Sequence, residues 1–238
     1  MLKDNLTIAF YTKDRHKAVG KALKSALGTT PKGVKFLIVE DQPKTPFRLS
    51  KEYKETLFTE DLFISEIPRK SSCGQLMNRC IIDSDTQWVL FCNDDLVFKE
   101  GWFEIAEKYY DKFPITLMFN FGACLINKSI IPKLGYFDER FLGGNREDQD
   151  MMIRILLKDI PHVNTWDETG ESLITHEPFY YQSACWNGEQ NEKYFIEKWG
   201  SIDYGALCKA AKEKSIKPNF IDGDWYPSYT TKYIREYA

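Results

Sequence analysis

The stretch WVLFCNDDLVF, residues 88–98, sets three polar side chains directly after a run of apolar ones. Residues 88–92 predict a buried strand, and Asn93, Asp94 and Asp95 follow at its end. Two adjacent carboxylates repel each other and are costly to remove from water, so they call for a compensating cation. Their oxygens suit Mg²⁺ or Mn²⁺, which leave coordination positions for substrate phosphates. A solvated turn explains the same residues, so both interpretations stay open at this point.

Strand and helix patterns alternate on both sides of this stretch. Strands are predicted at residues 6–12, 34–41, 61–68 and 115–131, the last with a bend at Gly122, and helices at 14–28, 72–83 and 191–200. This order predicts an α/β fold with a mainly parallel central sheet and helices on both faces. In such sheets ligands bind beyond the carboxyl ends of the strands, where Glu40, Asp41 and the 93–95 cluster would lie.

The composition excludes several classes of protein. The 238 residues carry a formal net charge of −3 and are 43% hydrophobic, which is typical of a globular protein and not of a uniformly basic nucleic-acid binder. The start, MLKDNLTIAF, lacks the apolar core of a signal peptide, and no apolar run approaches the roughly 20 residues that span a bilayer. We therefore expect a cytoplasmic protein without a transmembrane segment, with reduced cysteines because no C-x-x-C pair occurs. The phosphate-loop, dinucleotide-binding and nucleophile-elbow motifs are absent from the sequence.

A second acidic cluster lies in GGNREDQDMMIR, residues 143–154, where a glycine pair runs into a predicted helix. Helix electrostatics explains part of it: Asn145 is a candidate N-cap with Asp148 as its capping-box partner. Asp150 and Arg154 are spaced as an i,i+4 ion pair. Glu147 and Asp148, beside two glycines that allow close approach of a ligand, are equally consistent with a general base.

The histidine of LITHEPF, His176, ends a further apolar run. A lone histidine in such a place most often makes a structural hydrogen bond. It is also able to complete a mixed oxygen and nitrogen metal site with Asp95.

Taken in order, these segments resemble the GT-A-fold glycosyltransferases, above all those of glycosyltransferase family 2. FYTKDR (10–15) is similar to the family's first nucleotide-binding turn, and FLIVED (36–41) to the strand whose terminal acid contacts the base. RKSSCGQLMNRCI (69–81) resembles a Gly-x-x-x-Asn helix, here Gly74 and Asn78, and FCNDDLVF (91–98) falls where the family has a D-x-D motif. LGYFDERFLGGNREDQDMMIR (134–154) resembles the acceptor-side segment, and NEKYFIEKWG (191–200) the block after it. The resemblance covers about residues 6–200; Asn93 departs from D-x-D, and EDQP lacks the usual Gly-Ser.

The resemblance implies a metal-dependent glycosyltransferase that moves a sugar from a nucleoside-diphosphate donor, with UDP expected, to an acceptor hydroxyl with inversion. Asp148 would be the general base, and Asp95 and His176 would hold Mn²⁺ or Mg²⁺. The nucleotide sugar is expected to contact Thr12, Asp14, Arg15, Glu40, Asp41, Arg69, Asn78, Asn93 and Asp94, with Lys70 as a further candidate for its diphosphate. Glu147, Gly144 and Trp186 are expected at the acceptor. Residues 1–200 would form the GT-A domain, and residues 201–238 an extension packed on it as a possible active-site lid.

Two kinds of acceptor are compatible with the sequence: a glycan, free or lipid-linked, and hydroxymethylated phage DNA. A DNA acceptor predicts a basic groove, drawn from Lys128, Lys133, Arg140, Arg146, Lys232 and Arg235, and its target base would have to be reached by flipping or groove entry. Two alternative functions remain beside the glycosyltransferase. One is a metal-dependent nucleotidyltransferase, which would release pyrophosphate, and the other is a non-catalytic sugar-binding protein on the same fold.

Overall fold

The computed structural model describes residues 1–55, 62–67, 71–169, 172–176 and 188–219. The chain divides into two compact units. The sheet unit comprises Met1–Lys70, Arg79–Ser129 and Pro161–Gln182, and the helical unit comprises Ser71–Asn78, Ile130–Ile160 and Ser183–Ala238. Each unit is therefore assembled from stretches that are far apart in the sequence.

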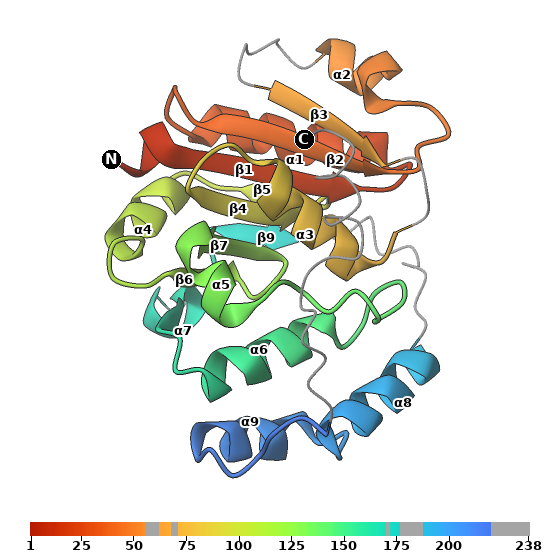
Figure 1. The fold of residues 1–238 in the computed structure, drawn as a ribbon. Helices are drawn as coiled ribbons and strands as arrows, with labels where there is room; N and C mark the ends of the chain where they lie inside the picture. Colours follow the sequence, from red (N-terminus) through yellow and green to blue (C-terminus); the bar gives the residue numbers. More distant parts are fainter. Residues whose placement is uncertain (56–61, 68–70, 170–171, 177–187, 220–238) are drawn as a thin grey trace. The chain divides into compact units, whose positions relative to one another are not determined.

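Within the described residues, the sheet unit contains a seven-stranded sheet in the order β3-β2-β1-β4-β7-β6-β8 (Figure 1). Its strands are β1 (Leu6–Thr12), β2 (Lys35–Asp41), β3 (Leu62–Ile67), β4 (Trp88–Asn93), β6 (Ile115–Phe119), β7 (Ala123–Asn127) and β8 (His162–Asn164). The first four are mutually parallel, β7 is antiparallel to both β4 and β6, and β8 is parallel to β6. A small antiparallel pair consists of β5 (Leu96–Phe98) and β9 (Ile174–His176). The predicted α/β class with a mainly parallel sheet is confirmed.

Helices connect these strands. In the sheet unit they are α1 (His16–Thr29), α2 (Lys51–Glu55), α4 (Trp102–Tyr109) and α7 (Thr165–Thr169), with 3₁₀ turns η1 (Leu2–Asn5) and η2 (Phe47–Leu49). In the helical unit they are α5 (Ile131–Leu134), α6 (Glu147–Leu157), α8 (Gly188–Trp199) and α9 (Tyr204–Lys212). Helix α3 (Cys73–Asp83) is shared, because the division between the units falls after Asn78. The 3₁₀ turn η3 (Lys128–Ile130) spans a further division between the units, which falls after Ser129. No helix in the described ranges is both long and apolar enough to cross a membrane.

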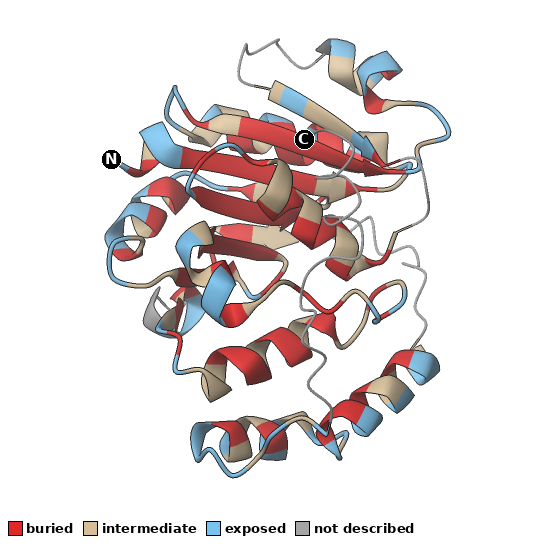
Figure 2. Ribbon diagram, in the orientation of Figure 1, coloured by how far each residue is buried: buried red, intermediate tan, exposed pale blue. Residues whose placement is uncertain are grey.

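The core of the sheet unit follows from the two-residue period of its strands. Ile8 and Phe10 of β1 and Leu90 of β4 point to one face, where they pack with Leu23 of α1 and Trp102 of α4. All five side chains are completely buried, and Figure 2 shows buried residues concentrated along β1, β2 and β4. Complete burial of such a side chain stabilises the fold by about 1.5–3 kcal/mol. This apolar layer therefore fixes the positions of the central strands, whose polar residues lie at their carboxyl ends.

The bend between β6 and β7 supports the end of β4. A Cβ atom at Gly122 would lie 3.1 Å from Phe119 Cδ1 and 3.2 Å from its carbonyl oxygen, which explains the glycine. The carbonyl of Gly122 accepts a hydrogen bond from the backbone N–H of Asn93 at 2.8 Å. The predicted glycine bend is therefore confirmed, and it fixes the first residue of the polar cluster.

The helical unit has an apolar core of its own. Phe141, Ile153 of α6, Phe195 and Trp199 of α8, and Leu207 of α9 are all buried in one cluster. Helix α9 therefore packs with α6, so residues 204–212 of the predicted C-terminal extension share a core with the helix that follows the glycine pair. Residues 220–238 of that extension, including Lys232 and Arg235, lie outside the described residues.

Candidate active site

The polar cluster after β4 lies at the edge of the sheet where β1 also ends. The two strands are parallel neighbours with Tyr11 opposite Asn93, so their carboxyl ends reach the same edge. The Tyr11 hydroxyl donates a hydrogen bond to Asn93 Oδ1, and the Thr12 hydroxyl donates one to Asp94 Oδ2 at 2.6 Å. Two of the residues predicted to meet the donor, Thr12 and Asp94, are thus in direct contact.

Arg15 lies against both carboxylates of the cluster. Its Nη1 is 2.7 Å from Asp94 Oδ1 and its Nη2 is 3.1 Å from Asp95 Oδ2. Burial raises the pKa of Asp94 to about 6, while the positive charge of Arg15 and the hydrogen bond from Thr12 act in the opposite direction. The compensating cation that the sequence required is therefore supplied in this structure by the chain itself.

His176 is brought to this cluster by the β5–β9 pair, in which it lies opposite Leu96. Its Nε2 is 3.9 Å from Asp95 Oδ1, and its ring contacts Phe119 with centroids 4.8 Å apart. Asp95 Oδ1 is buried and has no hydrogen-bond partner among the described residues. A carboxylate oxygen that lacks a partner and faces an imidazole nitrogen fits the mixed donor set of Mn²⁺ or Mg²⁺.

These two side chains would be the protein's share of such a site. No cluster of three or more His, Cys, Asp or Glu side chains able to hold a metal occurs in the ranges that the structure describes. Mg²⁺ and related ions commonly take one or two protein ligands and complete their shell with substrate phosphates and water. The residues present therefore suit an ion that binds together with a diphosphate.

The acids at the end of β2 are engaged with neighbouring parts of the chain. Both carboxylate oxygens of Glu40 lie 2.9 Å from the backbone N–H of Phe47, and burial raises the pKa of this side chain. Asp41 pairs with Lys13 at 2.9 Å, and Asp14 Oδ1 accepts a hydrogen bond from the backbone N–H of Lys44 at 2.8 Å. In this structure Glu40 and Asp14 therefore hold the segment after β2, whereas Asp41 binds a lysine that follows β1. The predicted contact of these acids with the nucleotide stays a prediction.

Asn78 is wholly buried and its side chain bonds to the chain itself. Its Oδ1 accepts from the N–H of Phe137 at 2.9 Å, and its Nδ2 donates to the Phe137 carbonyl and to Glu139 Oε1, each at 3.0 Å. Gly74 lies one turn earlier, where a Cβ atom would be 3.2 Å from the Asp138 carbonyl oxygen. The Gly-x-x-x-Asn pattern thus allows α3 to pack closely against residues 137–139, which lead into the glycine pair.

Residues 142–146, the glycine loop, lead into helix α6. The helix begins at Glu147, preceded by Arg146, and no side-chain hydrogen bond caps it within the described part of the chain. The interpretation of Asn145 as N-cap is therefore wrong: Asn145 has φ +108°, a left-handed value, where an N-cap residue is extended. The ion pair of Asp150 with Arg154 is confirmed, with 2.9 Å between Oδ2 and Nε.

Glu147 and Asp148, the acid pair, occupy different environments. Glu147 is only 6% exposed, and its Oε2 lacks a hydrogen-bond partner in the described structure. Burial raises its pKa to about 7, and the charge of Asp148 adds to this effect. Asp148 is half-buried, its Oδ1 accepts the N–H of Gln149 at 2.8 Å, and burial raises its pKa as well. Two neighbouring carboxyl groups with different environments are a common basis for dividing acid and base roles.

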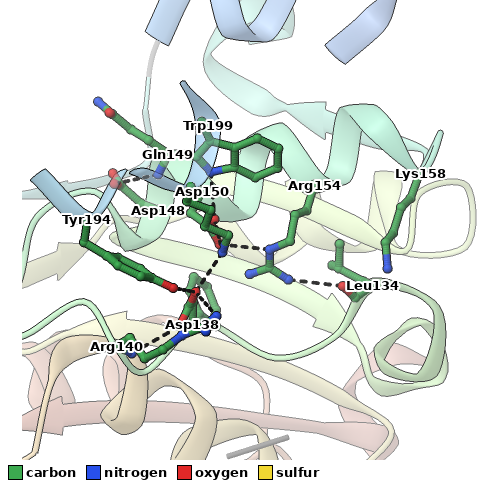
Figure 3. A network of polar contacts seen from close by, with 12 residues as sticks. Leu134, Asp138, Arg140, Asp148, Gln149, Asp150, Arg154, Lys158, Tyr194 and Trp199 are labelled. Atoms are coloured by element: carbon green, nitrogen blue, oxygen red, sulfur yellow. Dashed lines mark hydrogen bonds and ion pairs between the residues drawn. The ribbon is translucent and has the colours of Figure 1, made fainter. Parts of the chain in front are cut away.

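A buried ionic network below the acid pair was missed by the sequence-based analysis (Figure 3). Lys198 of α8 is fully buried, and its Nζ lies 2.7 Å from Asp138 Oδ2 and 2.5 Å from Asp150 Oδ1. Tyr194 also donates to Asp138, at 2.8 Å, and Trp199 donates to Asp150, at 3.0 Å. Lys198 and Trp199 lie in NEKYFIEKWG, residues 191–200, which the sequence analysis noted only as a resemblance, and of this network it predicted the pair of Asp150 with Arg154.

Three predicted contributors, Arg69, Lys70 and Trp186, lie outside the described residues. Three of the cations predicted for a DNA-binding groove bond within the chain. Lys128 donates to the Ser84 carbonyl at 2.6 Å, Arg140 pairs with Asp138, and Arg146 pairs with Glu192.

The geometry described above can be compared with that of known proteins. No model of a protein family matches this sequence, and no curated protein matches it. Solved structures do match. TarS of S. aureus is 14% identical, with a TM-score of 0.55 over 67% of this chain and 35% of TarS. TarS 1-349 in complex with UDP-GlcNAc is 16% identical, with a TM-score of 0.53 over 65% of this chain and 54% of that one. The mannosyltransferase PcManGT from Pyrobaculum calidifontis, in complex with GDP-Man and Mn²⁺, is 10% identical, with a TM-score of 0.55 over 67% and 54%.

At these identities the likeness establishes the fold. The chain has the GT-A fold, the α/β architecture of nucleotide-sugar glycosyltransferases, as predicted from the sequence. The chain spans 35% of the length of TarS and 54% of both PcManGT and TarS 1-349 with UDP-GlcNAc. It spans 61% of TarS 1-349 without ligand.

Proposed function

We propose that the protein is a metal-dependent glycosyltransferase that moves a sugar from a nucleoside-diphosphate donor, with UDP as its nucleotide, to an acceptor hydroxyl with inversion. The observation that carries the proposal is the meeting of Asp94, Asp95 and His176 at the carboxyl edge of a GT-A sheet. Neighbours with this fold bind UDP-GlcNAc or, with Mn²⁺, GDP-Man, which supports the class of donor.

On the donor side, Asp95 and His176 would hold Mn²⁺ or Mg²⁺, which when bound neutralises the charge that develops on the leaving diphosphate. Arg15 presents a guanidinium whose Nη1 and Nη2 bind one carboxylate each, those of Asp94 and Asp95, and a guanidinium also binds the oxygens of phosphate groups. Asp94, tied to Thr12 at the end of β1, orients Arg15. These residues bind and orient the diphosphate of the donor.

On the acceptor side, Asp148 takes the proton of the acceptor hydroxyl as its oxygen attacks the anomeric carbon. The new C–O bond forms on one face while the bond to the diphosphate breaks on the other, so the nucleoside diphosphate leaves and the configuration inverts. Asp148 suits this role better than Glu147 because its side chain is partly exposed, whereas Glu147 is almost completely buried. Glu147 then serves to orient the acceptor.

A glycan is the acceptor we propose. A DNA acceptor needs cations free to bind phosphates. Three of the six cations predicted for a DNA-binding groove, Lys128, Arg140 and Arg146, bond within the chain instead, and the formal net charge of the protein is −3.

The first test is hydrolysis of a panel of nucleotide sugars with and without Mn²⁺. The quantity measured is the nucleoside diphosphate released from each donor. The wild type should release UDP from one donor only with Mn²⁺, and Asp95→Ala should abolish this release. Asp85→Ala is a matched control, because Asp85 is an exposed aspartate whose side chain pairs with Lys35. Asp148→Asn should bind the donor normally and lose transfer. No release from any donor, together with no metal-dependent binding of UDP, would rule out the donor site.

A further inference from the structure

The glycine loop has a backbone that its own residues do not favour. Asn145 and the next residue, Arg146, have φ values of +108° and +76°. A non-glycine residue in this region is destabilised by roughly 1–3 kcal/mol, so it persists only where surrounding contacts hold it. Two such residues in succession, immediately before the acid pair, therefore require a support from elsewhere in the helical unit.

One side chain, Asn191 of α8, provides most of that support. Its Oδ1 accepts the N–H of Leu142 at 2.8 Å, and its Nδ2 donates to the carbonyls of Leu142 at 2.9 Å and Asn145 at 3.0 Å. A third contact, at 3.3 Å, reaches the Gly144 carbonyl. Asn191 is 1% exposed, so these bonds are shielded from water. Only a carboxamide offers an acceptor and two donors in one plane, and aspartate of the same shape lacks the donors.

The loop held by Asn191 also contacts the acid pair. The backbone N–H of Asn145 acts to lower the pKa of Glu147, against the effect of burial, and Asn191 holds the carbonyl of Asn145. Arg146 reaches back to α8, with its Nη2 2.9 Å from Glu192 and its guanidinium 5.4 Å from the ring centroid of Phe195. The start of α6, which has no side-chain cap in the described structure, is thus positioned through the loop.

We propose that Asn191 is a positioning residue for the acid pair: it holds the glycine loop in its left-handed conformation and thereby sets the direction of the Asp148 carboxylate. The inference rests on the proposed function, in which Asp148 receives the proton. Among the described residues, the side-chain hydrogen bonds of Asn191 go to backbone atoms of residues 142–145, so we assign it no part in proton transfer.

The test compares Asn191→Asp and Asn191→Ser with a matched control, Asn219→Asp. Asn219 also donates from its side chain to a backbone carbonyl, that of Glu197 at 2.9 Å, but it is exposed and far in sequence from the loop. Three quantities are measured for each variant: kcat and donor KM for sugar transfer, the Kd of UDP with Mn²⁺, and hydrogen exchange of the amides of residues 142–148 by mass spectrometry. Thermal unfolding reports whether each variant is folded.

For Asn191→Asp we expect kcat to fall about 100-fold, a loss of the size that a misplacement of about 1 Å can cause. Donor KM and the Kd of UDP should stay within about twofold of the wild type, and exchange at residues 142–148 should accelerate. Asn219→Asp should match the wild type in all three. The inference is overturned if Asn191→Asp and Asn191→Ser transfer at the wild-type rate, or if kcat and UDP binding fall together.

A failure of the proposed function is distinguishable. If the wild type transfers no sugar from any donor, the exchange measurement alone decides. Unchanged exchange at residues 142–148 in a folded Asn191→Asp variant would then show that the loop does not depend on Asn191.

Discussion

Replacing Lys198 with methionine should lower the free energy of unfolding by about 3 kcal/mol at neutral pH. Methionine fills nearly the same space but carries no charge, so Asp138 and Asp150, both buried, lose the ammonium that lies 2.7 Å and 2.5 Å from them. Breaking a buried ion pair by removing one partner costs roughly 3–5 kcal/mol. The lower end of that range applies, because Arg140 still pairs with Asp138 and Arg154 with Asp150.

The loss should depend on pH in a defined direction. Burial alone would raise the pKa of Asp138, but the hydrogen bond with Arg140 and the charge of Lys198 outweigh it and lower that pKa well below its usual range. A carboxylate of this kind stabilises the folded state above the ordinary aspartate pKa of about 3.9 and ceases to do so as the pH falls toward its folded value. Without Lys198 the Asp138 carboxylate becomes protonated at higher pH, and its charge then destabilises the folded variant less. The difference between wild type and variant should therefore shrink as the pH falls from 7 to about 4.

Urea unfolding followed by circular dichroism at pH 7 and pH 4 measures this difference. Lys35→Met is the control, because Lys35 is 35% exposed and pairs with an aspartate, Asp85, that is 59% exposed. Removing such a surface pair should cost less than about 1 kcal/mol. If Lys198→Met loses no more than this control at pH 7, the two aspartates do not depend on the lysine.

Three further outcomes follow from the site. Gly144→Ala should lower the free energy of unfolding, measured by thermal unfolding, by about 1 kcal/mol, because the new Cβ would lie 3.0 Å from Cys73 Sγ. Adding Cys73→Ala should recover part of this loss. Purely additive effects of the two substitutions would contradict the contact. Glu147→Gln should flatten the pH dependence of the free energy of unfolding. Because burial raises the pKa of Glu147 to about 7, the free energy of unfolding of the wild type should fall by up to about 3 kcal/mol as the pH rises from about 4 to 7. An equal fall in the variant would show that Glu147 does not titrate in this range. Arg15→Gln should remove the cation that pairs with Asp94 and Asp95. Mn²⁺ should therefore raise the melting temperature of the variant by more than it raises that of the wild type. Equal shifts would show that Arg15 and the metal do not share these carboxylates.

Local patterns were enough to predict most of the sheet unit. The apolar runs of β1, β2 and β4 are bounded by polar residues, so their positions and their common polar edge could be inferred without long-range information. The approach of His176 to Asp95 was also anticipated, because both residues end or follow apolar strands. Their role as metal ligands stays a prediction.

The helical unit was predicted less well because distant contacts override local preferences there. Asn145 is a good N-cap residue by type, yet Asn191, which is 46 residues away, bonds to its carbonyl and stabilises a left-handed conformation instead. Lysine in an amphipathic helix normally predicts a solvated face, and nothing near Lys198 in the sequence shows that it meets Asp138. Such a network becomes visible only when the strands and helices have been placed in space.

The Lys198 network has a consequence for the biosynthesis of the protein. Lys198 follows Asp138 by 60 residues, so the ribosome must add this whole stretch before the lysine can meet the aspartate. Translation proceeds at about 5–20 residues per second, so the segment that carries the acid pair waits for several seconds with Asp138 and Asp150 paired only to Arg140 and Arg154 and not yet to Lys198. Strands β1, β2 and β4, in contrast, have all been synthesised before that segment leaves the ribosome, so β1 can already pair with β2 and with β4. We therefore expect helix α6 to be among the last parts of the described chain to become protected from proteolysis during synthesis.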